Sequence, residues 1–162
     1  MEELLAAPLP AKVALLALAI ALAVSVVTDL RSRLILNVVT LPALSIALLC
    51  VFWLGGLSLL TEAAIGVLVC AGPFALMMLR GWMGAGDVKL MAVSGAVSGA
   101  AAGWPFSLAV LLYVAGAGGV QSLLWMGAAR ARGRERPRYV PYGVSIAVGT
   151  LAAFLWGGAL FQ

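Results

Sequence analysis

The chain has 162 residues, of which 64% are hydrophobic and only 10% are charged, and its mean hydropathy is +1.14. Soluble domains are roughly half apolar, so this composition excludes an ordinary soluble domain and predicts a protein surrounded by lipid. The net charge of +4 and the basic run at 129–140 do not require a nucleic-acid partner, because basic residues of membrane proteins gather in cytoplasmic loops.

Apolar segments follow one another along the whole chain, separated by short connections. Most of them approach the length of about 20 residues with which a helix crosses a bilayer. We therefore expect an all-α integral membrane protein, a bundle of six transmembrane helices that forms one domain over residues 1–162. The expected spans are about 11–28, 38–54, 60–79, 87–102, 104–128 and 140–160.

The connections between these segments alternate in charge. Lysine and arginine occur in or beside the connections at about 29–37, 80–88 and 129–139, whereas the second and fourth connections contain neither residue. Because basic residues are retained in cytoplasmic loops, this alternation places those three loops in the cytoplasm and both termini outside.

Few residues have side chains suited to catalysis. There is no histidine, and the two cysteines, Cys50 and Cys70, both lie within apolar segments, so we expect neither a metal site nor a cofactor. Asp29 ends the first segment and Asp87 begins the fourth, which would put both at the same cytoplasmic depth. Acidic groups at membrane depth are energetically unfavourable and usually serve a function or pair with another group.

These two aspartates allow two interpretations. Taken singly, Asp87 would cap the helix that it begins, and Asp29 would pair with Arg31 or Arg33 at the membrane surface. Taken together, two neighbouring carboxylates would share one proton, so that one of them acts as a base on a water molecule, as in aspartic proteases. This chemistry needs no histidine, cysteine or metal, and Asp29 and Asp87 are therefore the candidate catalytic pair.

Gly84 and Gly86 precede Asp87 in the stretch GWMGAGDVKL, residues 81–90. Glycines adopt backbone angles closed to other residues and leave room beside the carboxylate, so we expect these two to shape the site and to admit a substrate strand. The same stretch does not fit a phosphate-binding loop, because Asp87 stands where that loop requires lysine.

Three segments resemble the type IV prepilin peptidases. GAGDVKL (84–90) is similar to the GxGD motif of that family, DLRSRLILN (29–37) to the stretch with its other catalytic aspartate, and YVPYGVSIAVG (139–149) to a segment around Pro-Tyr-Gly. These peptidases are intramembrane aspartic proteases, so the resemblance implies that Asp29 and Asp87 are catalytic. It also implies a site shaped by further motif residues, namely Gly84, Gly86, Lys89, Asn37, Pro141, Tyr142 and Gly143. Lys89 would either lie beside Asp87 or extend to the membrane surface.

The resemblance further implies removal of a basic leader peptide from prepilins or pseudopilins at the cytoplasmic face of a bacterial inner membrane, with the apolar substrate helix and membrane lipids as partners. The chain lacks the insertion with paired CxxC cysteines found in the long members that also methylate, so we expect no methylation. It resembles the short forms of tight-adherence (Flp-type) pilus systems, with the archaeal preflagellin peptidases as a second option. Leu36 precedes Asn37 where the family usually has proline, a departure in the first loop.

Proton- or ion-coupled transport is a different function that also uses buried acids. Transporters commonly contain internal repeats and helices broken near the bilayer midplane. This sequence shows no repeat, and the two acids lie near one face, so transport is the alternative to the peptidase hypothesis. A third function, a purely structural subunit, would tolerate asparagine at both positions.

Overall fold

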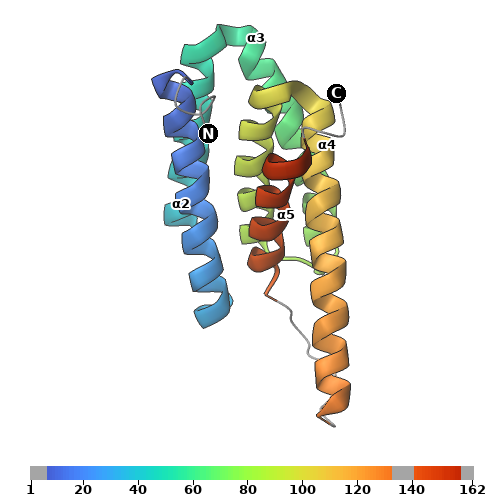
Figure 1. The fold of residues 1–162 in the computed structure, drawn as a ribbon. Coiled ribbons are helices and arrows are strands. Elements are labelled where there is room, and N and C mark those ends of the chain that lie inside the picture. Colours follow the sequence, from blue (N-terminus) through green and yellow to red (C-terminus); the bar gives the residue numbers. More distant parts are fainter. Residues whose placement is uncertain (1–6, 133–140, 158–162) are drawn as a thin grey trace.

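A computed structural model describes residues 7–132 and 141–157, and the regular structure in these ranges is helical (Figure 1). Its helices are α2 (Leu9–Ser32), α3 (Asn37–Leu79), α4 (Ala85–Ala131) and α5 (Tyr142–Trp156). The expectation of an all-α protein is confirmed. Among the described residues, α2, α3 and α4 are long and apolar enough to cross a membrane, and α5 is a shorter apolar helix.

The number of helices differs from the sequence prediction. Six were expected, whereas the described residues form four, because α3 and α4 each continue through an expected connection. Their only interruptions are pairs of non-helical residues, Gly55 and Gly56 in α3 and Ala102 and Gly103 in α4. Gly56 and Gly103 have φ angles of 60° and 74°, in the left-handed region that favours glycine. Two residues are enough to fold the chain over at each point, so no polar loop is needed there (Figure 1).

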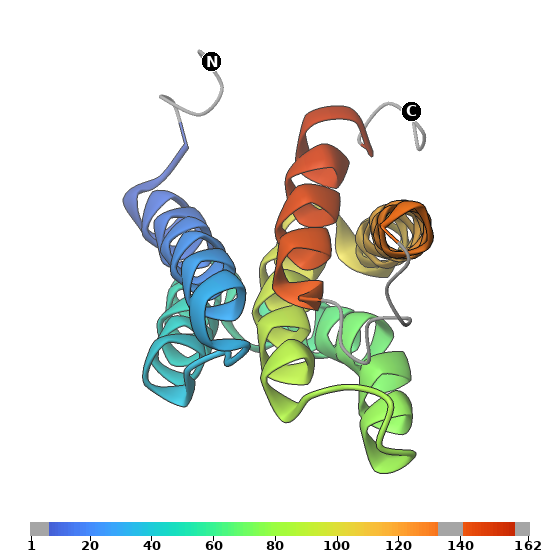
Figure 2. The ribbon, with the colours of Figure 1, turned by 90° about the horizontal axis from the view of Figure 1, so that it is seen from below.

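The first half of α4 forms the centre of the bundle. It lies between the two halves of α3 and beside α5 (Figure 2). Every residue from 90 to 99 is buried, which is the behaviour of a helix surrounded on all sides. α2 packs mainly against α3 and α5 at the edge of this centre.

Small residues bring α3 and α4 together at this centre. A Cβ atom on Gly66 or on Gly95 would meet the backbone carbonyl oxygen of the other residue, and a Cβ atom on Gly99 would meet that of Glu62. Lipid gives no hydrophobic drive between helices, so such backbone contact is a main source of helix association in membranes. The glycines therefore set the distance between the two helices.

Hydrogen bonds join the buried polar side chains of this centre. The hydroxyl groups of Ser98 and Ser107 lie 2.9 Å apart, and the Thr150 hydroxyl donates to that of Ser94 at 3.2 Å. The Cys70 thiol donates to the Ser107 carbonyl oxygen at 3.2 Å. Since water is scarce in such a core, these pairs satisfy groups that would otherwise be unfavourably buried.

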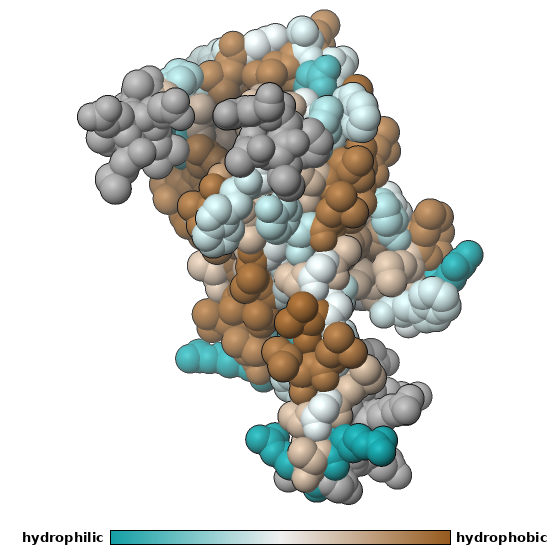
Figure 3. All heavy atoms as spheres, turned by 45° about the vertical axis from the view of Figure 1, so that its right-hand side comes forward, coloured by the Kyte–Doolittle hydropathy of each residue, from teal (hydrophilic) through white to brown (hydrophobic). Residues whose placement is uncertain are grey.

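The two ends of the bundle differ. At the lower end of Figure 1 lie the turns at 33–36 and 80–84, the first turn of α5 and the projecting last turns of α4, and we name this the loop end. The two interruptions, the start of α2 and the end of α5 lie at the opposite end. In the face shown in Figure 3, apolar residues cover the middle, and hydrophilic residues gather at the projecting tip.

The glycine contacts generate a stability prediction. Gly95→Ala places a methyl group against the Gly66 backbone and should lower the free energy of unfolding by about 1–3 kcal/mol, as in other overpacked cores. Thermal unfolding of the purified protein in detergent measures the effect. Gly72→Ala is the matched control, because a Cβ atom there meets nothing within 4 Å. Equal melting temperatures for the two variants would contradict this account of the helix contact.

Candidate active site

Asp29 lies in the last turn of α2, and its side chain is only 7% exposed. Its Oδ2 atom accepts a hydrogen bond of 2.7 Å from the backbone N–H of Gly143, in the first turn of α5. N–H groups of a first turn have no partner within their own helix, and the helix dipole favours a negative charge there. The Asp29 carboxylate therefore caps α5 from another helix.

The end of α2 is fixed at the same residue. Arg33 closes the helix in the left-handed conformation, with φ 53°, and its N–H donates to the Asp29 carbonyl oxygen at 2.9 Å. Both the backbone and the side chain of Asp29 are thus engaged. The sequence suggested a pairing of Asp29 with Arg31 or Arg33. The carboxylate does interact electrostatically with Arg33, and its hydrogen bond comes from Gly143.

Gly143 makes the contact with Asp29 possible. A Cβ atom at this position would lie 2.9 Å from Asp29 Oδ2 and 3.2 Å from Asp29 Cβ. Any side chain here would have to displace the carboxylate or the first turn of α5. The need for glycine at 143 is therefore steric.

Asp87 is the third residue of α4 and is half-buried. Its Oδ2 atom accepts a 3.2 Å hydrogen bond from the Gly84 N–H, so it does cap its own helix. It also lies close enough to Asp29 for the two carboxylates to interact electrostatically, and the Tyr142 hydroxyl is within the same range of Asp87. The structure thus brings the two acids that the sequence singled out within electrostatic range of each other.

The two glycines before Asp87 lie beside different parts of the structure. A Cβ atom on Gly86 would lie 2.6 Å from Ile35 Cβ and 3.1 Å from the Ile35 carbonyl oxygen. The neighbour that occupies the space beside Gly86 is therefore the turn between α2 and α3. Gly84 has an extended backbone, with φ −78° and ψ 147°, that other residues also adopt. A Cβ atom on Gly84 would lie 3.2 Å from Asp87 Oδ2, so this glycine leaves room beside the carboxylate.

Lys89 contacts Asn37 rather than Asp87. Its Nζ atom donates a 2.7 Å hydrogen bond to Asn37 Oδ1, at the first residue of α3. Together with the contact between Gly86 and Ile35, this bond holds the turn from α2 to α3 against the first turns of α4. Lys89 and Asn37, two of the expected site residues, therefore stabilise the turn between α2 and α3.

The missing proline in this turn has little structural effect. Leu36 caps α3 with φ −78° and ψ 127°. Proline holds φ near about −65° with a spread of about 15°, so the leucine backbone already lies within the range of proline. The departure from the family pattern leaves the turn in a proline-like conformation.

Pro141 and Tyr142 complete the set of expected residues. Pro141 caps α5, and the Tyr142 ring packs edge to face on Phe74, with centroids 6.0 Å apart. The Tyr142 hydroxyl lies against Gly118 of α4, where a Cβ atom would collide with it. The start of α5 is therefore wedged between α3 and α4 beside Asp29.

Comparison with known proteins identifies the chain. A model of the type IV leader peptidase family matches residues 16–123, a stretch that contains Asp29 and Asp87. The chain belongs to this family. No curated protein and no solved structure gives a significant match. The resemblance noted in the sequence is confirmed, and membership in the type IV leader peptidase family indicates a peptidase.

Sequence reasoning missed a polar cluster beside the motifs of this chain. Gln121 Nε2 donates to the Pro141 carbonyl oxygen at 2.8 Å, and the Ser145 hydroxyl donates to Gln121 Oε1. The signal available was a single glutamine within a long apolar segment. Ser25, one turn before Asp29, is also buried, and its hydroxyl has no hydrogen-bond partner among the described residues.

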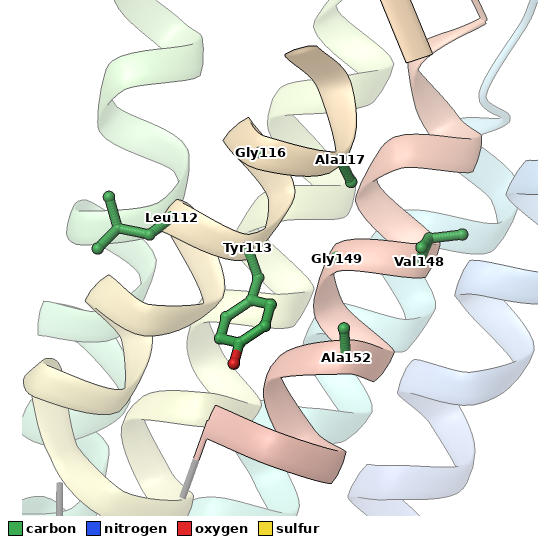
Figure 4. Close-up of a pocket in the computed structure, with 7 residues that line it drawn as sticks. All are labelled: Leu112, Tyr113, Gly116, Ala117, Val148, Gly149 and Ala152. Atoms are coloured by element: carbon green, nitrogen blue, oxygen red, sulfur yellow. The ribbon is translucent and has the colours of Figure 1, made fainter. Parts of the chain in front are cut away.

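A groove follows the seam between α4 and α5. Its part near the acid pair has a volume of about 510 Å³ and includes Leu30, Gln121 and Pro141 in its lining. A second part of about 420 Å³, lined by small and apolar residues, is drawn in Figure 4. Ala117 and Val148 line both parts, so the groove is continuous along the two helices.

The bond between Lys89 and Asn37 generates a prediction. Lys89→Met and Asn37→Ala should each lower the free energy of unfolding by about 1 kcal/mol, because each removes one hydrogen bond. The double variant should lose little more than either single variant, since the bond is lost only once. The free energies of unfolding of wild type, the two single variants and the double variant are measured in mixed micelles by titration with a denaturing detergent. Strictly additive losses would show that the two side chains do not depend on each other.

Proposed function

We propose that this protein is an intramembrane aspartic endopeptidase that removes the basic leader peptide from type IV (Flp-like) prepilins at the cytoplasmic membrane face. The observation that carries the proposal is the electrostatic proximity of Asp29 and Asp87, from different helices, in a chain of the type IV leader peptidase family. Transport, the alternative, has no supporting observation among the described residues.

The geometry supports a general acid–base mechanism. One carboxylate of the pair is ionised and takes a proton from water, while the water oxygen attacks the carbonyl carbon of the scissile peptide bond. The other carboxyl is protonated and gives its proton to the carbonyl oxygen. When the tetrahedral intermediate collapses, the carbon–nitrogen bond breaks and the leaving nitrogen receives a proton from the pair. The Gly143 N–H keeps Asp29 oriented throughout, because it binds one carboxylate oxygen.

The distribution of basic side chains supports one orientation in the membrane. Apart from Lys12, the described basic residues lie at the loop end: Arg31, Arg33, Arg80, Lys89, Arg130 and Arg132. At the opposite end Trp53, Trp104 and Trp156 are exposed by 85%, 52% and 63%, as expected for an aromatic belt. We therefore place the loop end in the cytoplasm, and each half of α3 and of α4 across the membrane, which makes six crossings with both termini outside.

The short connections between the helices support the proposal that the chain is of the short, Flp-like type. The turns at 33–36 and 80–84 leave no room for an inserted domain between α2, α3 and α4. The two cysteines of the chain are 20 positions apart and form no CxxC pair. Both features favour a short leader peptidase that does not methylate its product. Its apolar outer surface would contact membrane lipids and the hydrophobic helix of the prepilin.

Co-expression with a pilin precursor tests the proposal. Wild type should remove the leader, whereas Asp29→Asn and Asp87→Asn should each lower the cleavage rate by about a thousandfold or more, because the two acids act as one unit. Gel shift and N-terminal sequencing of the pilin report the reaction. Glu62→Gln is the matched control, since Glu62 is a half-buried acid toward the opposite end. Full cleavage by either aspartate variant would remove that residue from the mechanism.

A shared proton predicts the pH dependence of cleavage. The pair is active with one group ionised and one protonated, so the rate should fall at low pH, where both are protonated, and at high pH, where both are ionised. The initial rate of cleavage of a prepilin in lipid vesicles, measured across the pH range, gives the profile. A rate that stays constant through the acid range would rule out the shared proton.

A further inference from the structure

One turn of α4 holds the first turn of α5 through Gln121. The amide nitrogen of Gln121 donates to the Pro141 carbonyl oxygen at 2.8 Å, and its amide oxygen accepts from the Ser145 hydroxyl. Ser145 is 1% exposed, so this hydroxyl depends on a protein partner. A single side chain therefore binds the residue before α5 and a residue one turn into it.

Gly143 lies between these two attachment points. Its N–H makes the 2.7 Å hydrogen bond to Asp29 Oδ2. A first-turn N–H points out of its helix, so its position relative to Asp29 depends on what holds the helix start in place. Here the helix start is held by Gln121 at both sides of the N–H.

The chemistry of Gln121 suits such a role. A glutamine in an apolar helix segment is unfavourable unless its donor and acceptor are both used, and here Pro141 and Ser145 use them. Gly118, one turn before Gln121, receives the Tyr142 hydroxyl in the space that its missing side chain leaves. The same stretch of α4 thus contacts the start of α5 by hydrogen bonding and by close packing.

We propose that Gln121 is a positioning residue of the acid pair, which places the Gly143 N–H, through Pro141 and Ser145, where it orients the Asp29 carboxylate. The effect on cleavage rests on the proposed function. The effect on Gly143 is a structural property that is measurable without any peptidase activity.

The Gly143 amide can be observed by itself. Tyr142–Gly143 is the only Tyr-Gly pair in the chain, so labelling tyrosine with ¹³C at the carbonyl and glycine with ¹⁵N selects one resonance. In detergent micelles, Gln121→Met should move the amide proton resonance to higher field, because the N–H loses its carboxylate partner. Ser145→Ala, which removes one of the two bonds, should cause a smaller movement. Ser122→Ala is the control, since it removes a neighbouring hydroxyl of α4 and should change nothing.

Cleavage of a prepilin by the same proteins tests the catalytic consequence. A displacement of a catalytic group by about 1 Å lowers rates by about a hundredfold, so Gln121→Met should reduce kcat by roughly 10- to 100-fold, and Ser145→Ala by less. Ser122→Ala should cleave like wild type. Should Gln121→Met unfold, Ser145→Ala supplies both measurements.

The possible outcomes separate the two proposals. An unmoved Gly143 resonance in Gln121→Met and Ser145→Ala overturns the positioning role, whatever the cleavage rates are. A moved resonance with unchanged kcat overturns its importance for catalysis. If the Gly143 resonance moves in the variants but folded wild type does not cleave prepilin, the positioning role is supported. That result counts against the proposed function.

Discussion

The hydrogen bond between the Gly143 N–H and the Asp29 carboxylate is the contact on which the rest of the site depends. A first-turn N–H lacks a partner within its helix, and a carboxylate that is 7% exposed needs a donor. If the two helices separated, the Gly143 N–H and the Asp29 carboxylate would each lose a hydrogen-bond partner, which is unfavourable where water is scarce. The bond thereby joins α2 and α5, which are far apart in the sequence, at the position of the acid pair.

The two acids are supported in different ways. Asp87 begins the helix whose residues 90–99 are buried on all sides, so its backbone belongs to the rigid centre of the bundle. Asp29 lies on α2, at the edge, where Leu18, Ala21 and Leu22 of the same helix join the apolar core and the Gly143 N–H binds the carboxylate. The position of Asp29 relative to Asp87 is therefore set by this apolar packing together with a small number of hydrogen bonds at the loop end.

Much of this arrangement could be predicted from the sequence, but not all of it. Hydropathy and charge are local properties, and they gave an all-helical chain with Asp29 and Asp87 at one depth. The helix count was wrong because a pair of residues such as Gly55 and Gly56 reverses the chain without a polar loop. The neighbour of Gly86 and the partners of Gln121 depend on tertiary contacts, which no local pattern contains.

The two-residue interruptions also affect how such a chain enters a membrane. In the proposed arrangement, each half of α3 and of α4 crosses the membrane, and a joint of two residues leaves no loop between the halves. Each long helix would then enter as a hairpin with its joint leading. The joints at Gly55–Gly56 and Ala102–Gly103 and their adjacent residues contain no charged side chain, so the acid that must be carried through the hydrocarbon with them is Glu62, which lies beside Gly103. Within residues 7–132 and 141–157, the same short joints offer no long loop at that end for enzymes or antibodies to reach.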